Sequence, residues 1–157
     1  MKVLVVAVGR VRGVLEAPVA EYEARARRYW KLEVVEVEGG APGRDPSGER
    51  VREAEAGRIL ARVPDGFTVV ALTRAGKGMS SRDWVALLET EGVRSSPGVA
   101  VLIGGAHGLG AAVLERAGRR VSLSPLTLPH EMARLVLAEQ LYRAGTMLRG
   151  EPYHKGA

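Results

Sequence analysis

The sequence predicts an α/β fold in which helices cover both faces of one mostly parallel sheet. Short apolar runs rich in Val and Ile alternate along the chain with segments of helical periodicity. No repeat and no linker interrupts this alternation, so we expect the 157 residues to form a single domain. Successive segments of this kind build βαβ units, whose strands lie parallel.

The first elements follow from apolar patterning. Residues 2–9 (KVLVVAVG) are a continuous apolar run ended by glycine, which is typical of a buried strand. A helix is expected at about residues 14–30, where Pro18 is tolerated only because it lies near the first turn. Residues 32–39 alternate apolar and acidic side chains, as a strand does.

A loop separates this unit from the next helix. Residues 40–48 (GAPGRDPSG) contain three glycines and two prolines. Asp45 or Ser47 is expected to cap the helix at 49–63, because their short side chains accept hydrogen bonds from its first amides. A third strand at 67–73 follows. Three helices are then expected, at residues 81–92, 111–118 and 129–147, of which the second is short and the last is long. Two strands, at residues 98–105 and 119–124, alternate with them.

Composition limits where the protein acts and what it contains. No run of about 18 apolar residues is present and the N-terminal apolar segment is too short for a signal peptide, so we expect a cytoplasmic protein without membrane contact. The chain has no cysteine, and His107, His130 and His154 are scattered, so we expect no metal. The net charge of +5 is compatible with a nucleic acid partner and equally with ordinary solvated faces.

Two glycine-rich segments suggest ligand binding. Residues 74–81 (RAGKGMSS) differ from a phosphate-binding loop, because Gly78 follows Lys77 where that loop requires Ser or Thr. A flexible loop is the favoured interpretation. Residues 104–110 (GGAHGLG) follow the fourth strand and lack dinucleotide-binding spacing. They form either a tight turn or a ligand site, and the second interpretation gains support because ligands of open α/β sheets bind beyond the carboxyl ends of strands.

The final helix indicates a partner. Its apolar residues lie almost all round the helix axis, so a single sheet face cannot cover them. The second covering surface is most simply another copy of the chain, which predicts a homodimer. These residues are Met132, Ala133, Leu135, Val136, Leu137, Ala138, Leu141 and Met147.

Four fragments together resemble a known family. They are VAVG near the start, IGGAHG in the fourth strand and its turn, SLSPLTLPHEMARLVLAEQLYRA, and the terminal GEPYHK. The chain is similar over its whole length to the RlmH family of SPOUT-class pseudouridine methyltransferases of the large ribosomal subunit. The likeness is most specific over residues 101–155.

This resemblance implies a deep trefoil knot at about 101–157, an exception to the rule that chains do not thread their own loops. The knot loops would hold S-adenosylmethionine (S-adenosyl-L-methionine), with glycines leaving room beside it and the backbone of the LSPLTL segment binding adenine. The cofactor-binding positions that match are Leu72, Gly104, Gly105, Leu123, Ser124, Pro125, Leu126, Thr127 and Leu128.

The resemblance also implies the reaction, methylation of N3 of pseudouridine 1915 in 23S rRNA within assembled 70S ribosomes. Such a protein must align donor and acceptor and help N3 lose its proton. The catalytic candidates are His130, Arg134, Tyr153 and His154. Other roles remain open for each of them. His130 can serve in packing or capping, and Arg134 can contact RNA or brace the knot. Tyr153 and His154 can belong to a C-terminus that is merely ordered.

Two other classes of function remain. A non-catalytic ribosome-binding factor would share the basic surface without needing an intact cofactor pocket, so calorimetry with S-adenosylmethionine distinguishes it. A nucleotide-hydrolysing module is disfavoured by the interrupted lysine motif and would show turnover of ATP.

Overall fold

The computed structural model describes residues 1–155 and confirms the predicted α/β architecture. Five strands form one sheet in the order β2-β1-β4-β3-β5, and every neighbouring pair is parallel. The strands are β1 (Lys2–Val8), β2 (Lys31–Val37), β3 (Thr68–Gly78), β4 (Gly98–Ile103) and β5 (Arg119–Ser122). The helices are α1 (Glu16–Ala26), α2 (Gly48–Leu60), α3 (Ser81–Val93), α4 (Ala111–Arg116) and α5 (His130–Leu148), with short 3₁₀ turns η1 (Gly13–Leu15) and η2 (Pro152–His154).

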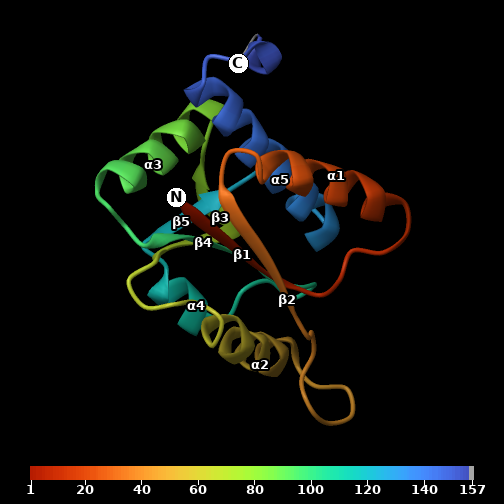
Figure 1. Ribbon diagram of the computed structural model, residues 1–157. Coiled ribbons are helices and arrows are strands. Elements are labelled where there is room, and N and C mark those ends of the chain that lie inside the picture. Colours follow the sequence, from red (N-terminus) through yellow and green to blue (C-terminus); the bar gives the residue numbers. More distant parts are fainter. Residues whose placement is uncertain (156–157) are drawn as a thin grey trace.

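Helices cover both faces of the sheet. Helices α1, α3 and α5 lie on one face, and α2 and α4 lie on the other (Figure 1). Alternate residues of β1 enter the two resulting cores, Val3 and Val5 on the first side and Leu4 and Val6 on the second. This two-sided burial explains why β1 and β4 are continuous apolar runs rather than alternating ones.

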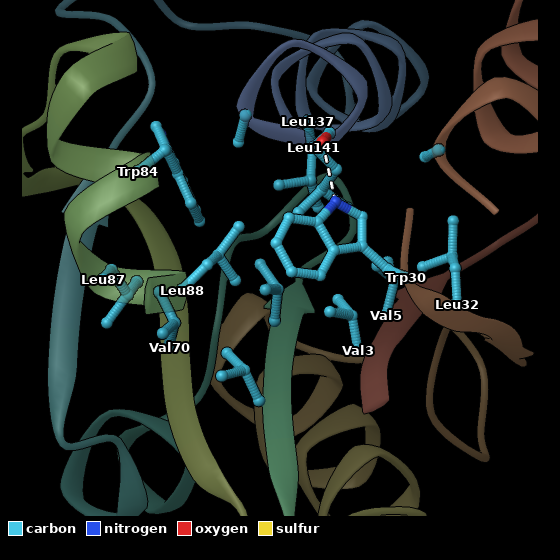
Figure 2. Close-up of a cluster of buried hydrophobic side chains, with 14 of the residues drawn as sticks. Val3, Val5, Trp30, Leu32, Val70, Trp84, Leu87, Leu88, Leu137 and Leu141 are labelled. Carbon is cyan, nitrogen blue, oxygen red and sulfur yellow. Dashed lines mark hydrogen bonds between the residues drawn. The ribbon is translucent and has the colours of Figure 1, made fainter. Parts of the chain in front are cut away.

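Trp30 joins the sheet edge to the last helix. Figure 2 shows its indole among the apolar side chains of the α1, α3 and α5 face, with the ring nitrogen directed at α5. Its Nε1 donates a hydrogen bond of 2.8 Å to the carbonyl oxygen of Leu141. The bond satisfies a buried donor and fixes α5 against the turn before β2.

Two predicted boundaries are wrong. Helix α1 ends at Ala26 rather than near residue 30, because a turn in which the amide of Tyr29 donates to the carbonyl of Ala26 brings Trp30 into the core. Residues 74–78 are not a flexible loop. They continue β3 after a bulge, in which Leu72 and Lys77 both oppose Val121 of β5.

Helix α5 is covered within the chain more than its sequence suggested. It contacts the sheet, α1 and α3, and these account for its buried residues, which include Leu137, Ala138 and Leu141. Apolar surface remains at Met132 and Leu148, which are 38% and 41% exposed, and at the partly buried Ala133, Leu135, Val136 and Met147. The chain itself therefore covers part of the apolar surface of α5, and the remainder is compatible with the predicted second copy. Within the described residues, no helix has the length and apolar character needed to cross a membrane.

We predict that Gly76→Ala destabilises the fold. A Cβ at residue 76 would lie 2.6 Å from the backbone nitrogen of Val121, so β5 would have to move. We expect a loss of about 1–3 kcal/mol in the free energy of unfolding, as for other overpacked sites. Denaturant titration measures it. Gly78→Ala is the matched control, since nothing lies within 4 Å of its Cβ position, and an equal loss in both variants would contradict the explanation.

Candidate functional site

The main cavity lies beside the bulge of β3 and the carboxyl end of β4. It has a volume of about 740 Å³ and is bounded by these two strands, the loops after β4 and β5, and the start of α5. This volume lies in the range of small-molecule sites, and its place is the one expected for ligands of an open parallel sheet. Its lining residues are Leu72–Arg74, Ile103–Ala106, Gly108, Leu109, Leu123, Ser124, Leu126–His130 and Ala133.

The structure brings the predicted cofactor positions together at this cavity. All nine except Pro125 line it, although they come from three separate segments of the chain. Thr73 and Arg74 also line it and were missed. They directly follow Leu72, at the bulge of β3, and this position could have identified them. The expectation of a flexible loop from residue 74 led to their omission.

The glycine segment forms a tight turn. The amide of Gly108 donates a 3.0 Å hydrogen bond to the carbonyl of Gly105, and Gly108 has a left-handed φ of +80°. A Cβ on Gly104 would lie 2.7 Å from the carbonyl carbon of Gly108. The turn can close this way only because both positions lack a side chain.

Gly105 is required for a different reason than the one expected. We expected it to leave room for a cofactor, but its Cβ would point at Val8, 3.0 Å away, and at the carboxylate of Glu55, 3.3 Å away. Glu55 is 4% exposed, and its Oε2 accepts a 2.9 Å hydrogen bond from the amide of Gly40. A side chain at Gly105 would therefore disturb the α2 face of the core as well as the pocket.

The loop after β5 is held by polar contacts. The hydroxyl of Ser122 donates to the carbonyl of Ser124 at 2.8 Å, and the amide of Leu126 donates to the hydroxyl of Ser124 at 3.0 Å. Arg74 donates to the hydroxyl of Thr127 at 2.6 Å, which ties the end of β3 to the loop. The wall built by residues 123–128 is thus preorganised, and three leucines, a serine and a threonine of this segment line the cavity.

His130 stands at the pocket at the first position of α5. Its Nε2 lies 3.1 Å from Oε1 of Glu131, and its ring covers Gly9, whose Cβ position is 3.1 Å from the ring Cε1. Of the lining residues, only Arg74 and His130 have titratable side chains. No group of three or more His, Asp or Glu side chains within residues 1–155 is arranged to hold a metal ion.

Arg134 does not line the cavity. It is 9% exposed, and its guanidinium donates to both carboxylate oxygens of Glu23, at 2.8 and 3.2 Å, and to Glu36 at 2.6 Å. Burial would lower the pKa of Arg134, but the hydrogen bonds from Glu23 and Glu36 outweigh burial and raise the pKa. The contacts assign Arg134 to bracing α5 against α1 and β2, in place of a catalytic role.

We predict that Arg134→Gln mainly costs stability. Removing one partner of a buried ion pair leaves Glu23 uncompensated, and such changes cost about 3–5 kcal/mol. The matched control is Arg143→Gln, which breaks the i, i+4 pair with Glu139 and should cost below about 1 kcal/mol. Thermal unfolding measures both. A fully stable Arg134→Gln variant that has lost its activity would contradict the bracing role.

Tyr153 and His154 lie at the opposite end of α5 from His130. The amide of Glu151 donates to the carbonyl of Thr146 at 2.9 Å, and Tyr29 donates to the Glu151 carboxylate at 2.5 Å. The tail is therefore anchored to its own subunit. A helix of 19 residues separates it from the pocket, a distance of roughly 28 Å at 1.5 Å per residue.

Tyr153 acts as an anchor in this arrangement. Its ring packs on Tyr142 with centroids 4.5 Å apart, and its hydroxyl donates to Glu139 at 3.1 Å. Burial, with further contributions from Tyr22 and Glu139, raises the pKa of Tyr153 well above its usual value. In this arrangement the proton of the Tyr153 hydroxyl is donated to the Glu139 carboxylate. In contrast, Nδ1 of His154 is buried and has no hydrogen-bond partner among the described residues.

Comparison with known proteins agrees with this geometry. A family model described as "Predicted SPOUT methyltransferase" matches residues 1–154. A protein of Gemmatimonas aurantiaca named ribosomal RNA large subunit methyltransferase H is 53% identical over 99% of this chain and 100% of its own length. A protein of Syntrophotalea carbinolica with the same name is 44% identical over 98% and 99%. The chain belongs to the SPOUT methyltransferase family.

Proposed function

We propose that this protein transfers a methyl group from S-adenosylmethionine to N3 of a pseudouridine in large-subunit ribosomal RNA, on assembled ribosomes in the cytoplasm. The observation that carries the proposal is the cavity beside the bulge of β3 and the carboxyl ends of β4 and β5, in a chain whose full-length relatives are named large-subunit rRNA methyltransferases. We also propose that the whole chain forms one catalytic domain, with the knot that family membership implies in its C-terminal third.

The pocket fits the methyl donor. S-adenosylmethionine, when bound, supplies an electrophilic methyl group attached to a sulfonium sulfur. The cavity has the volume of a small-molecule site, and its lining is apolar and backbone-rich. We assign the adenine side to the backbone of residues 123–128, with Leu72, Gly104 and Gly105 forming the opposite wall. Pro125 shapes the loop without facing the cavity.

His130 is the proposed group that accepts the N3 proton. Its ring is at the pocket, and Nε2 is paired with Glu131, which leaves Nδ1 as the free acceptor when Nε2 carries the proton. Glu131 then stabilises the imidazolium that forms. The positive charge of Arg74, which also lines the cavity, stabilises the negative charge that the pseudouridine base carries once N3 has lost its proton. Replacement of His130 by Ala should slow transfer by about 100-fold or more while leaving cofactor affinity unchanged.

The complete site is proposed to span a homodimer. The tail is anchored roughly 28 Å from the pocket of its own chain, so His154 and Lys155 do not reach that pocket. In a two-fold symmetric dimer the tail of one subunit can lie beside the cofactor of the other, with Tyr153 holding it in place.

The non-catalytic ribosome-binding factor is the alternative to be tested first. A chain without a methyl donor has no use for a preorganised pocket wall tied to β3 through Arg74 and Thr127. Calorimetry of the purified protein with S-adenosylmethionine distinguishes a methyltransferase from a non-catalytic ribosome-binding factor. Absence of binding would support the ribosome-binding factor.

We predict that assembled 70S ribosomes are methylated at least about tenfold more efficiently than isolated 23S rRNA. The single sheet domain contains no separate RNA-binding module, so its specificity must come from a composite surface of RNA and protein. Transfer of labelled methyl groups, followed by mass spectrometry of the modified nucleotide, measures the ratio. Equal rates on both substrates would contradict the requirement for an assembled particle.

A further inference from the structure

We propose that the free β5 edge of the sheet is the surface that binds RNA phosphates next to the pocket. This inference rests on the proposed function, because it assigns the RNA of that reaction to one face of the molecule. Five exposed cationic side chains define the edge cluster: Arg74, Lys77, Arg116, Arg119 and Arg120.

These cations are not neutralised within the chain. None of the five lies within 4.0 Å of a carboxylate among the described residues. Lys77 has an electrostatic effect on Asp83, but the carboxylate of Asp83 already accepts hydrogen bonds from the amide and hydroxyl of Ser80 at 2.7 and 2.8 Å. Ser80 is also the main cause of the lowered pKa of Asp83, and Lys77 adds to it.

Several cations on the other faces have partners within the chain. Arg134, Arg25 and Arg143 pair with carboxylates on the α1 and α5 side. On the α2 side, arginines donate to backbone carbonyls, as Arg58 does to Glu38 and Gly40 at 2.9 and 2.8 Å. At the β5 edge, five exposed cations lie together without a carboxylate partner, and such a concentration of positive charge is the property of a polyanion-binding surface.

The edge cluster is continuous with the pocket. Arg74 lines the cavity, and Lys77 stands opposite Val121 in the strand register, beside Arg120. From Ser122 at the pocket end of β5 to Arg119 is about 10 Å at the rise of a strand. That is about the rise of three stacked nucleotides. RNA with one base in the pocket thus has its neighbouring phosphates within reach of the cluster.

A simpler role accounts for only part of the cluster. Charged residues on an edge strand prevent pairing with other sheets, which explains Arg119 and Arg120. It does not explain Arg116, which lies in α4, or Arg74, whose guanidinium is at the cavity. Arg120 also donates to the carbonyl of Leu114 at 3.0 and 3.2 Å, so its removal would disturb α4.

The test removes the three charges of the cluster that neither line the pocket nor donate to the carbonyl of Leu114. The variant is Lys77→Gln/Arg116→Gln/Arg119→Gln. The matched control, Lys31→Gln/Arg62→Gln/Arg94→Gln, removes three exposed cations at the amino ends of β2, β3 and β4, opposite the pocket. Binding to purified 70S ribosomes and to a single-stranded oligouridylate is measured against salt concentration, with calorimetric S-adenosylmethionine binding as the check that the pocket is intact.

We expect the edge variant to bind both probes at least about tenfold more weakly, with a salt slope reduced by about 2 to 3, while the control and the cofactor affinity stay within about twofold of the original protein. Equal weakening in both variants, or none in either, would overturn the assignment of the β5 edge. Failure of the proposed function would be distinguishable from failure of this inference. If the proposed function is wrong, the unmodified protein methylates no ribosomal RNA, whether or not the β5 edge binds RNA.

Discussion

Gly104→Ala should lower the affinity for S-adenosylmethionine by about 100-fold. The new Cβ would lie 2.7 Å from the carbonyl carbon and 2.9 Å from the carbonyl oxygen of Gly108, and 3.0 Å from the amide nitrogen of Leu109. The turn between residues 105 and 109, which forms one wall of the cavity, must therefore move. Loss of two or three backbone contacts to a ligand, each worth about 0.5–1.5 kcal/mol, accounts for a change of this size.

The affected atoms are at the surface, so the domain should remain folded. Residues 106–108 of the turn are exposed, and the Cβ meets none of the core strands. Calorimetry gives the affinity and thermal unfolding gives the stability. Gly57→Ala in α2 is the control, since nothing lies within 4 Å of its Cβ position. Normal cofactor binding by a folded Gly104→Ala variant would contradict the placement of the cofactor at this wall.

The sequence predicted the strands and helices because apolar periodicity depends on local burial. The central strands, covered on both sides, were recognisable as continuous apolar runs, and Ser47 caps α2 as predicted by accepting a 3.2 Å hydrogen bond from the amide of Arg50. The extension of β3 through residues 74–78 was missed. Glycines there indicate a loop, whereas Gly76 is required by the close approach of β5, a strand more than 40 residues later.

The site was predictable in position but not in the roles of its residues. The parallel direction of the strands places Leu72 of β3 beside the carboxyl ends of β4 and β5, so the segments predicted to bind the cofactor converge as expected. The function of Arg134 depends on Glu23 and Glu36, which belong to other elements and are brought to it by tertiary packing. The same holds for Glu55 behind Gly105, because no local pattern links residues 50 positions apart.

Two inactive variants should restore each other's activity when their subunits are mixed. One subunit carries Gly104→Ala and so lacks a competent pocket. The other carries Tyr153→Ala/His154→Ala, which removes the anchor of the tail and the imidazole that it presents. A heterodimer then contains one site in which an intact pocket meets an intact tail from the other subunit, and one site in which both are defective.

Random exchange converts half of the subunits into heterodimers, each with one of two sites restored, so the mixture should reach about one quarter of the original activity for a two-fold symmetric dimer. Native mass spectrometry confirms the exchange, and methyl transfer to 70S ribosomes gives the activity. The control pairs the tail variant with a subunit that carries all three substitutions, which forms heterodimers but restores no site. An exchanged mixture as inactive as this control would show that the tail does not complete the partner's pocket. The requirement for a partner follows from the roughly 28 Å of α5 between His130 and the anchored tail, since neither end can move toward the other without unfolding a helix that Trp30 and Arg134 hold in the core.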